Sequence, residues 1–208
     1  MTFDKVLESV ERYYSRKVEA HGPTPRGVDW NSPESQRLRF EQLVKICDPG
    51  QPFTINDYGC GYGAFATYLR EQGYEFEYAG YDISSKMIAE AEELHAGAEG
   101  LRFFADESAL GEADYTVASG IFNVRLETGE GAWREYVLHT LDKIARLSRR
   151  GFAFNVLTSY SDKEFMRPDL YYADPLVLFD HCKRRHSRFV SLLHDYPLYE
   201  FTMLVRKG

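Results

Sequence analysis

Three glycines at alternate positions follow an apolar run that ends near residue 57. The segment reads Asp57-Tyr58-Gly59-Cys60-Gly61-Tyr62-Gly63-Ala64, and a helical pattern begins directly after it. Glycines leave backbone amides unhindered, and a helix N-terminus is partly positive, so the loop is suited to bind a small ligand. It matches the dinucleotide pattern Gly-x-Gly-x-x-Ala and also an acidic-x-Gly-x-Gly-x-Gly pattern. A tight turn without a ligand is the third interpretation.

Acidic residues end the next two apolar runs. Asp82 closes Gly80-Tyr81-Asp82, where a carboxylate can accept hydrogen bonds from both hydroxyls of a ribose. Asp106 and Glu107 follow the run at 101–105, where a carboxylate can accept from the amino group of adenine. Only about 145 residues follow the glycine loop, too few for the second nucleotide-binding half and the substrate domain of nicotinamide dehydrogenases. These features favour an adenosyl ligand over a nicotinamide one.

The elements that must position these residues are short apolar runs alternating with helical patterns, which is typical of β-α units on a parallel sheet. We expect strands at 53–57, 77–82, 101–105, 114–119 and 151–157, and helices at 63–72, 85–96, 132–149 and 175–185. Gly151 is expected to end the helix at 132–149. Two final runs, 189–193 and 199–205, are separated by too short a gap for a crossover helix, so they should pair antiparallel.

Two further helices are expected before the sheet. Apolar residues at three- and four-residue steps predict a helix at about 2–19, and the Gly/Pro-rich segment 22–27 must be a loop. A second helix starts with Ser32 as N-cap and Pro33 at its first position, and it ends before Pro49. We therefore divide the chain into an N-terminal helical cap, residues 1–51, and a cofactor-binding domain, residues 52–208.

The stretch from about 52 to 207 resembles the class I, Rossmann-like, S-adenosylmethionine-dependent methyltransferases. The resemblance rests on Asp57-x-Gly59-x-Gly61-x-Gly63, on Gly80-x-Asp82-x-Ser84-x-x-Met87, on Asp106 and on the terminal strand pair. It implies an α/β three-layer sandwich with a seven-stranded, mostly parallel sheet whose last strand is antiparallel beside the fifth.

The resemblance also implies roles for individual residues. Gly59, Gly61 and Gly63 would approach the methionine moiety, Asp82 the ribose, and Asp106, with Glu107 beside it, the adenine amino group. The adenine face would pack on Ile83 or Met87, and Met87 has a core position as its alternative. Asp57 either contacts the cofactor or only fixes the loop. Further cofactor contacts are expected from Ser119, Trp30, Gln36 and Arg39, the last two toward the methionine carboxylate unless they are exposed on the surface.

Candidates for handling the acceptor lie in the cap and at the later strand ends. His21 could titrate near neutrality and act as a base, or be an exposed loop histidine. His194, before Asp195, could act from the ligand side of the sheet or be a hydrogen-bonded turn residue. Tyr14 completes the candidate catalytic set, within an aromatic wall that would exclude water. That wall is expected to contain Tyr13, Tyr14, Trp30, Phe122, Tyr160, Tyr171 and Tyr172.

Composition narrows the class of partner. The 208 residues carry a net charge of −7, which repels phosphate backbones and anionic lipid headgroups, so neither nucleic acid nor a membrane is expected to bind. No run approaches the roughly 20 apolar residues of a membrane helix, and we expect a cytoplasmic protein. The three cysteines form no Cys-x-x-Cys pair and are expected to be reduced, packed thiols. The segment at 119–123 lacks the pattern of amino-directed nucleic-acid methyltransferases, and no metal-binding arrangement is recognised at the strand ends.

We therefore expect an enzyme that transfers a methyl group from S-adenosylmethionine to an oxygen or nitrogen atom of a small-molecule acceptor, without a metal. Two alternatives remain from the sequence. One is a protein that binds S-adenosylmethionine without turnover, as a partner subunit or sensor. The other is a small NAD(P)-dependent oxidoreductase.

Overall fold

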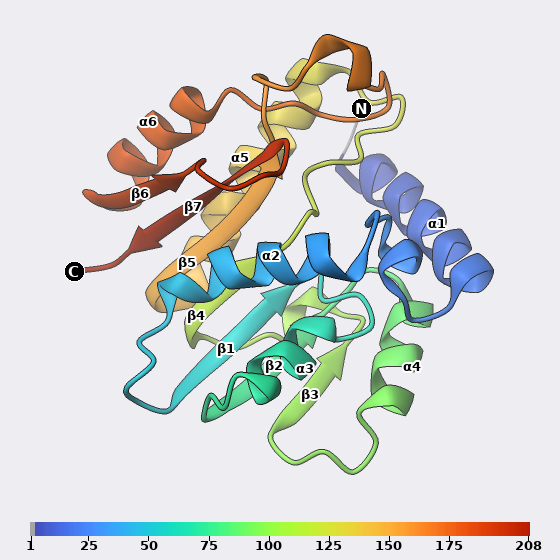
Figure 1. The fold of residues 1–208 in the computed structure, drawn as a ribbon, viewed down its shortest axis with the longest axis vertical. Coiled ribbons are helices and arrows are strands. Elements are labelled where there is room, and N and C mark those ends of the chain that lie inside the picture. Colours follow the sequence, from blue (N-terminus) through green and yellow to red (C-terminus); the bar gives the residue numbers. More distant parts are fainter. Residues whose placement is uncertain (1–2) are drawn as a thin grey trace.

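The structure, a computed structural model, describes residues 3–208, with side chains from Lys5 onward. Its seven strands form one sheet in the order β3-β2-β1-β4-β5-β7-β6 (Figure 1). The strands are β1 Phe53–Tyr58, β2 Phe76–Tyr81, β3 Leu101–Phe104, β4 Ala113–Ala118, β5 Ser148–Leu157, β6 Phe189–Leu193 and β7 Glu200–Arg206.

The sheet is parallel from β3 to β5 and antiparallel at its other edge. β7 pairs antiparallel with both β5 and β6, with Val156 opposite Phe201 and Leu192 opposite Met203. Placing β7 between β5 and β6 buries its residues from Glu200 to Val205. The expected fold class, a mostly parallel seven-stranded sheet with an antiparallel last strand beside the fifth, is confirmed.

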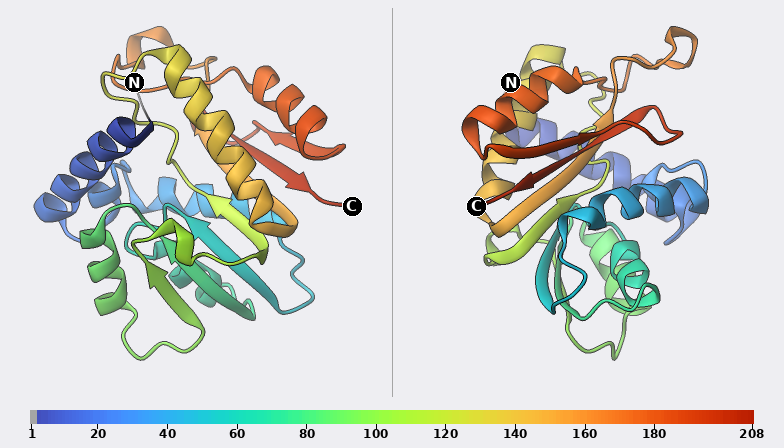
Figure 2. Two further views of the ribbon diagram at one scale, coloured as in Figure 1. Left: turned by 180° about the vertical axis from the view of Figure 1, so that it is seen from behind. Right: turned by 60° about the vertical axis from the view of Figure 1, so that its left-hand side comes forward.

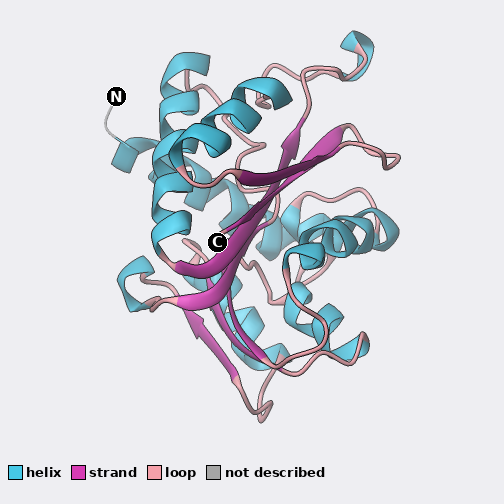
Figure 3. Ribbon diagram, turned by 90° about the vertical axis from the view of Figure 1, so that its left-hand side faces the viewer, coloured by secondary structure: helices cyan, strands magenta, loops and turns pink. Residues whose placement is uncertain are grey.

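Helices cover both faces of the sheet, which gives three layers (Figure 3). α2 and α3 lie on one face, and α5 and α6 on the other (Figure 2). α4 lies beside β3, and α1 crosses the edge of the molecule next to α4. The helices are α1 Phe3–His21, α2 Pro33–Leu43, α3 Ala64–Glu71, α4 Ser85–Leu94, α5 Glu130–Arg146 and α6 Pro175–Arg185.

The expected start of α2 is confirmed in detail. Ser32 is its N-cap, accepting a hydrogen bond from the Ser35 amide, and Pro33 occupies the first turn. Ser35 completes the reciprocal capping interaction. The helix ends at Leu43, before Pro49 as expected, and a 3-10 turn at Val44–Ile46 follows.

The expected end of α5 and the role of Gly151 were wrong. α5 ends at Arg146, and Gly151 lies inside β5, which begins at Ser148. A Cβ atom at position 151 would lie 2.7 Å from the carbonyl oxygen of Val205, so the glycine permits close approach of β7. Two consecutive arginines, Arg149 and Arg150, follow the start of β5 and do not suggest a buried strand. They form ion pairs with Asp114 and Asp48.

Hydrophobic side chains pack on both faces of the sheet, and Trp133 of α5, Phe152 of β5 and Phe201 of β7 are fully buried in one core cluster. Phe40, Phe65 and Tyr68 pack together between α2 and α3. The three cysteines, Cys47, Cys60 and Cys182, are free and buried. Among the residues described, no helix is long and apolar enough to cross a bilayer.

Candidate active site

The glycine loop joins the end of β1 to the start of α3. Gly59, Gly61 and Gly63 have φ angles of +85°, +53° and +79°, which side-chain-bearing residues rarely adopt. Space is also limiting, because a Cβ atom at Gly59 would lie 2.2 Å from a methyl carbon of Ile121. The amides of Gly59 and Cys60 both donate to the carbonyl oxygen of Tyr81, which ties the loop to the end of β2.

Asp82 lies directly after β2 and faces the loop. Its carboxylate accepts hydrogen bonds from the amides of Gly61 and Ser84, both at 2.9 Å. Burial raises its pKa to about 6, against the lowering effect of these two amides. Each oxygen accepts only one of these bonds and retains acceptor capacity for hydroxyl groups of a ligand.

Asp57, near the end of β1, is the second carboxylate at this site and is buried. It accepts a hydrogen bond of 2.7 Å from the hydroxyl of Tyr78. Burial raises its pKa to about 7, and the nearby Asp82 contributes in the same direction. Burial therefore disfavours the charged form of Asp57.

A roof over this edge comes from α1 and the segment after it. Tyr14 is half-buried, and desolvation raises the pKa of its hydroxyl far above the ordinary value, so it stays protonated. Trp30 lies on Gly120, where a Cβ atom would be only 2.2 Å from the indole ring. Ser15 holds α1 to α4 by a buried 2.7 Å hydrogen bond to Ser84.

Together these residues enclose a pocket at the carboxyl ends of β1, β2 and β4. Its free volume is about 90 Å³, less than the roughly 300–1,000 Å³ of typical small-molecule pockets. The predicted site residues in its wall are Tyr14, Trp30, Gln36, Asp57, Gly59, Gly61, Asp82, Ile83, Met87 and Ser119.

Gln36 and Arg39 differ although they lie one turn apart on α2. Gln36 lines the pocket and accepts a hydrogen bond from the hydroxyl of Tyr62. Arg39 does not line it: its guanidinium binds both carboxylate oxygens of Glu200, at 2.5 and 2.9 Å, and lies 3.9 Å from the ring centroid of Trp30. The expected contact of Arg39 with a ligand carboxylate is therefore replaced by a buried ion pair that supports Trp30.

Three other predicted contacts lie outside the pocket wall. Asp106 is exposed and caps a 3-10 turn by accepting from the Ser108 amide, and Glu107 forms an ion pair with Lys143. Gly63 is packed under the side chain of His95, whose Nε2 lies 3.1 Å from the Gly63 carbonyl oxygen. Gly63 therefore serves the packing of α4 against the loop.

The structure does not bring the two candidate histidines to Tyr14. His21 is exposed at the end of α1, and His194 is exposed between β6 and β7, near Tyr160 and Phe201. Their alternative readings, a loop histidine and a turn residue, agree with these positions.

The aromatic wall contains different residues from those expected. Of the seven, only Tyr14 and Trp30 line the pocket, whereas Phe122 is core, packed on Phe154, and Tyr160 is exposed. The other aromatic residues of the wall were not predicted from the sequence: Phe40 and Phe65, and four tyrosines, of which three, Tyr58, Tyr62 and Tyr81, come from strand ends and the loop, and the fourth is Tyr136. These three tyrosines adjoin the glycine loop or Asp82 in sequence, which was an available signal. Tyr136, in the middle of α5, gave none.

Comparisons with known proteins agree with this geometry. Residues 55–151 match the family model described as a methyltransferase domain. A Mycobacterium tuberculosis protein named as a methyltransferase, Rv1506c, is 52% identical over 165 residues, covering 79% of this chain and 99% of that one.

Among solved structures, human N-acetylserotonin methyltransferase with bound S-adenosylmethionine superposes with a TM-score of 0.67 at 14% identity, over 100% of this chain and 60% of that one. The N-methyltransferase NodS from Bradyrhizobium japonicum, with bound S-adenosylhomocysteine, gives 0.67 at 13% identity, over 95% and 97% of the two chains. These two similarities concern the fold.

The fold and the pocket define a class I methyltransferase. The chain belongs to the S-adenosylmethionine-dependent methyltransferases, and S-adenosylmethionine is its methyl donor. The pocket residues suit this donor: Gly59 and Gly61 leave the loop backbone open, and Asp82 retains acceptor capacity for ribose hydroxyls. A nicotinamide oxidoreductase and a binding protein without turnover are set aside by this assignment.

Proposed function

We propose that this enzyme transfers the methyl group to an oxygen or nitrogen atom of a small-molecule acceptor, without a catalytic metal. The observation that carries the proposal is the roof over the pocket, where Leu7, Val10, Tyr14 and Trp30 face Ser119 and the glycine loop. A roofed, mainly apolar pocket that is partly open to solvent suits a small molecule better than a polymer. The net charge of −7 supports this by disfavouring nucleic acid.

The names of two fold relatives agree with such an acceptor. The human neighbour is named for a small molecule, N-acetylserotonin, and the Bradyrhizobium neighbour is named as an N-methyltransferase. Because a net charge of −7 disfavours anionic lipid and nucleic acid, we propose neither a membrane nor a nucleic-acid partner, and we propose a cytoplasmic location.

When bound, S-adenosylmethionine supplies a methyl group on a sulfonium centre that is already electrophilic. The main task of the protein is then to hold the acceptor in line with that methyl group and to exclude water. Asp82 holds the ribose, the glycine loop receives the methionine moiety, and Ile83 and Met87 pack on the adenine. Tyr14 stays protonated, so it orients the acceptor as a hydrogen-bond donor and does not act as a base.

The cap has to move for this function. The free volume of about 90 Å³ is too small for a nucleoside with a methionine tail, so the roof must open to admit it. Within the proposed cap of residues 1–51, the movable part is 13–31, whereas α2 is fixed to the sheet by the Arg39–Glu200 pair. We call residues 13–31 the lid, because this segment would open to admit ligand and close over it.

Transfer of a radiolabelled methyl group tests the proposal. The enzyme is incubated with labelled S-adenosylmethionine, excess chelator and fractions of a metabolite extract, and labelled products are separated by mass. We expect a labelled product of low mass that forms in the presence of chelator. Label found only in protein or nucleic acid, or transfer that requires an added divalent ion, contradicts the proposal.

A further inference from the structure

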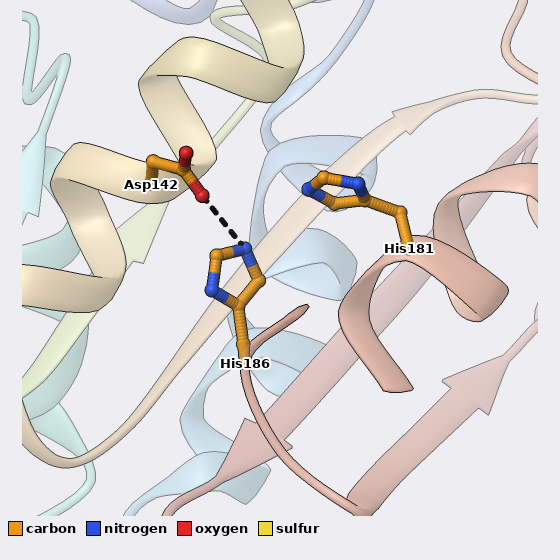
Figure 4. A group of neighbouring side chains, drawn as sticks. All are labelled: Asp142, His181 and His186. Atoms are coloured by element: carbon orange, nitrogen blue, oxygen red, sulfur yellow. Dashed lines mark ion pairs between the residues drawn. The ribbon is translucent and has the colours of Figure 1, made fainter. Parts of the chain in front are cut away.

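Three metal-ligating side chains converge between α5 and α6, away from the pocket (Figure 4). Asp142 lies on α5 and His181 on α6, and His186 directly follows the end of α6. The Nε2 atom of His186 lies 3.5 Å from a carboxylate oxygen of Asp142. One ligand atom from each of the three residues lies within 4.8 Å of the other two. The group therefore has the donors and the proximity of a metal site.

Both imidazoles have an unused nitrogen in this group. The Nε2 atoms of His181 and His186 are buried and have no hydrogen-bond partner among residues 3–208. The side chain of His186 is only 6% exposed. Buried polar atoms without partners are rare in folded proteins, because desolvation without compensation is costly. The two orphaned nitrogens point to a ligand that accepts electron pairs.

We propose that His181, His186 and Asp142 bind a divalent transition metal, with Zn²⁺ as the leading candidate, through two imidazole nitrogens and one carboxylate oxygen. Two histidines and a carboxylate form a common zinc ligand set, and water would complete a tetrahedral shell. Zinc bonds of about 2.0–2.1 Å require ligand atoms roughly 3.3 Å apart, so ligand atoms that now lie within 4.8 Å of one another approach by at most about 1.5 Å on binding. The ion would join α6 to α5.

The neighbouring cationic side chains do not occupy the proposed metal site. Arg185 contacts the same oxygen of Asp142 at 3.5 Å, but its side chain is 65% exposed and can turn into solvent. Lys207 is held by the carbonyl oxygens of Ala145 and Ser148. None of the three ligands lines the methyl-transfer pocket, and Asp142 lies six residues beyond Tyr136, about 9 Å along the axis of α5. The site is separate from the proposed metal-free chemistry.

Metal titration of the full chain, without an affinity tag and stripped by chelator, tests the proposal. We expect Zn²⁺ to bind with a stoichiometry of one in calorimetry and to raise the unfolding temperature. Co²⁺ should give the visible absorption of a four- or five-coordinate site. His181→Ala and Asp142→Asn should each weaken Zn²⁺ binding by about tenfold or more, while His139→Ala, a control on the same helix, should leave it unchanged.

Asp142→Asn preserves the shape of the side chain, and circular dichroism verifies that each variant is folded. Zn²⁺ binding weaker than about 100 µM in the parent chain overturns the proposal. Binding that is equally strong in the parent, His181→Ala and Asp142→Asn overturns it as well, because the ion would then sit elsewhere.

Discussion

Carboxylates lie away from solvent in two regions of the molecule, and their partners differ: a cation in one region and neutral hydrogen-bond donors in the other. At the junction of α2 with β7, Glu200 is 1% exposed and is bound by the guanidinium of Arg39. At the pocket, Asp57 is buried and Asp82 is half-buried among neutral donors, a tyrosine hydroxyl and backbone amides, and their pKa values are raised to about 7 and about 6. Burial disfavours the charged form of a carboxylate, and a cation offsets part of that cost only at Glu200.

The same contrast separates the two helices that precede the sheet. α2 is held by the buried ion pair and by Phe40 and Leu43 in the core. α1 packs Val6, Leu7 and Val10 on the core and is joined to α4 by the hydrogen bond between Ser15 and Ser84. It has no buried ion pair to the sheet like that of α2, so we expect residues 13–31 to open more readily than α2.

Removing the paired carboxylate should have the largest effect. Glu200→Ala leaves the Arg39 guanidinium buried without its partner, and we expect the free energy of unfolding to fall by about 3–5 kcal/mol. Chemical denaturation measures this. Arg184→Ala, which removes an exposed ion pair with Asp180, is the control and should cost less than about 1 kcal/mol. Equal effects of the two variants would remove the distinction between the regions.

Removing a pocket carboxylate should reduce binding and spare the fold. We expect Asp82→Ala to weaken the affinity for S-adenosylhomocysteine by about 1.5–3 kcal/mol, because charge-assisted hydrogen bonds to the ribose are lost. Calorimetric titration measures the affinity, with Asp195→Ala, at an exposed position, as the control. An unchanged affinity in folded Asp82→Ala would show that Asp82 does not hold the ribose.

The pH dependence of stability tests the cost of the second pocket carboxylate. The folded-state pKa of Asp57 is about 7, above the ordinary 3.8, so its contribution to stability is fully present below pH 3.8 and is lost as pH rises through 7. Asp57→Asn should therefore be more stable than the parent at pH 8, with a free energy of unfolding higher by about 1–2 kcal/mol. This gain should shrink toward pH 5. The Tyr78 hydroxyl can still donate to the amide oxygen. Parallel stability profiles of the two proteins from pH 5 to pH 8 would contradict this.

The sequence predicts the fold well because its local signals agree with the final packing. Alternating apolar runs and helical patterns locate all seven strands, and Ser32 and Pro33 locate the start of α2. The error at Gly151 arose because a glycine after a helical pattern also occurs where two strands approach closely. Only the register with Val205 distinguishes the two cases.

The candidate site could be predicted where it is local in sequence. Gly59, Gly61 and Asp82 lie at strand ends, and strand order brings them to one edge. The partner of Arg39 is Glu200, 161 residues away, so its ion pair left no local signal. Tyr136 and the Asp142, His181 and His186 cluster depend likewise on how α5 packs against the sheet and α6, which spacing along the chain does not reveal.

The smallest expected effect concerns the attachment of α1. Ser15 donates its one hydroxyl proton to Glu11, so Ser84 must donate to Ser15 in the 2.7 Å bond that joins α1 to α4. Ser15→Ala leaves the Ser84 hydroxyl without this acceptor, and we expect a loss of about 0.5–1 kcal/mol. Hydrogen exchange should accelerate in residues 13–31 and stay unchanged in α2, because only the lid is loosened.

Ligand should have the opposite effect on the same amides. S-adenosylhomocysteine orders Tyr14 and Trp30 over the bound nucleoside, so exchange in residues 13–31 should slow in the parent chain and in Ser15→Ala, while α2 exchanges slowly throughout. Ser9→Ala, on the exposed side of α1, controls for a general loosening of that helix. If residues 13–31 exchange slowly and identically with and without ligand, they are a fixed cap. The pocket would then have to admit its donor by moving some other part of its wall.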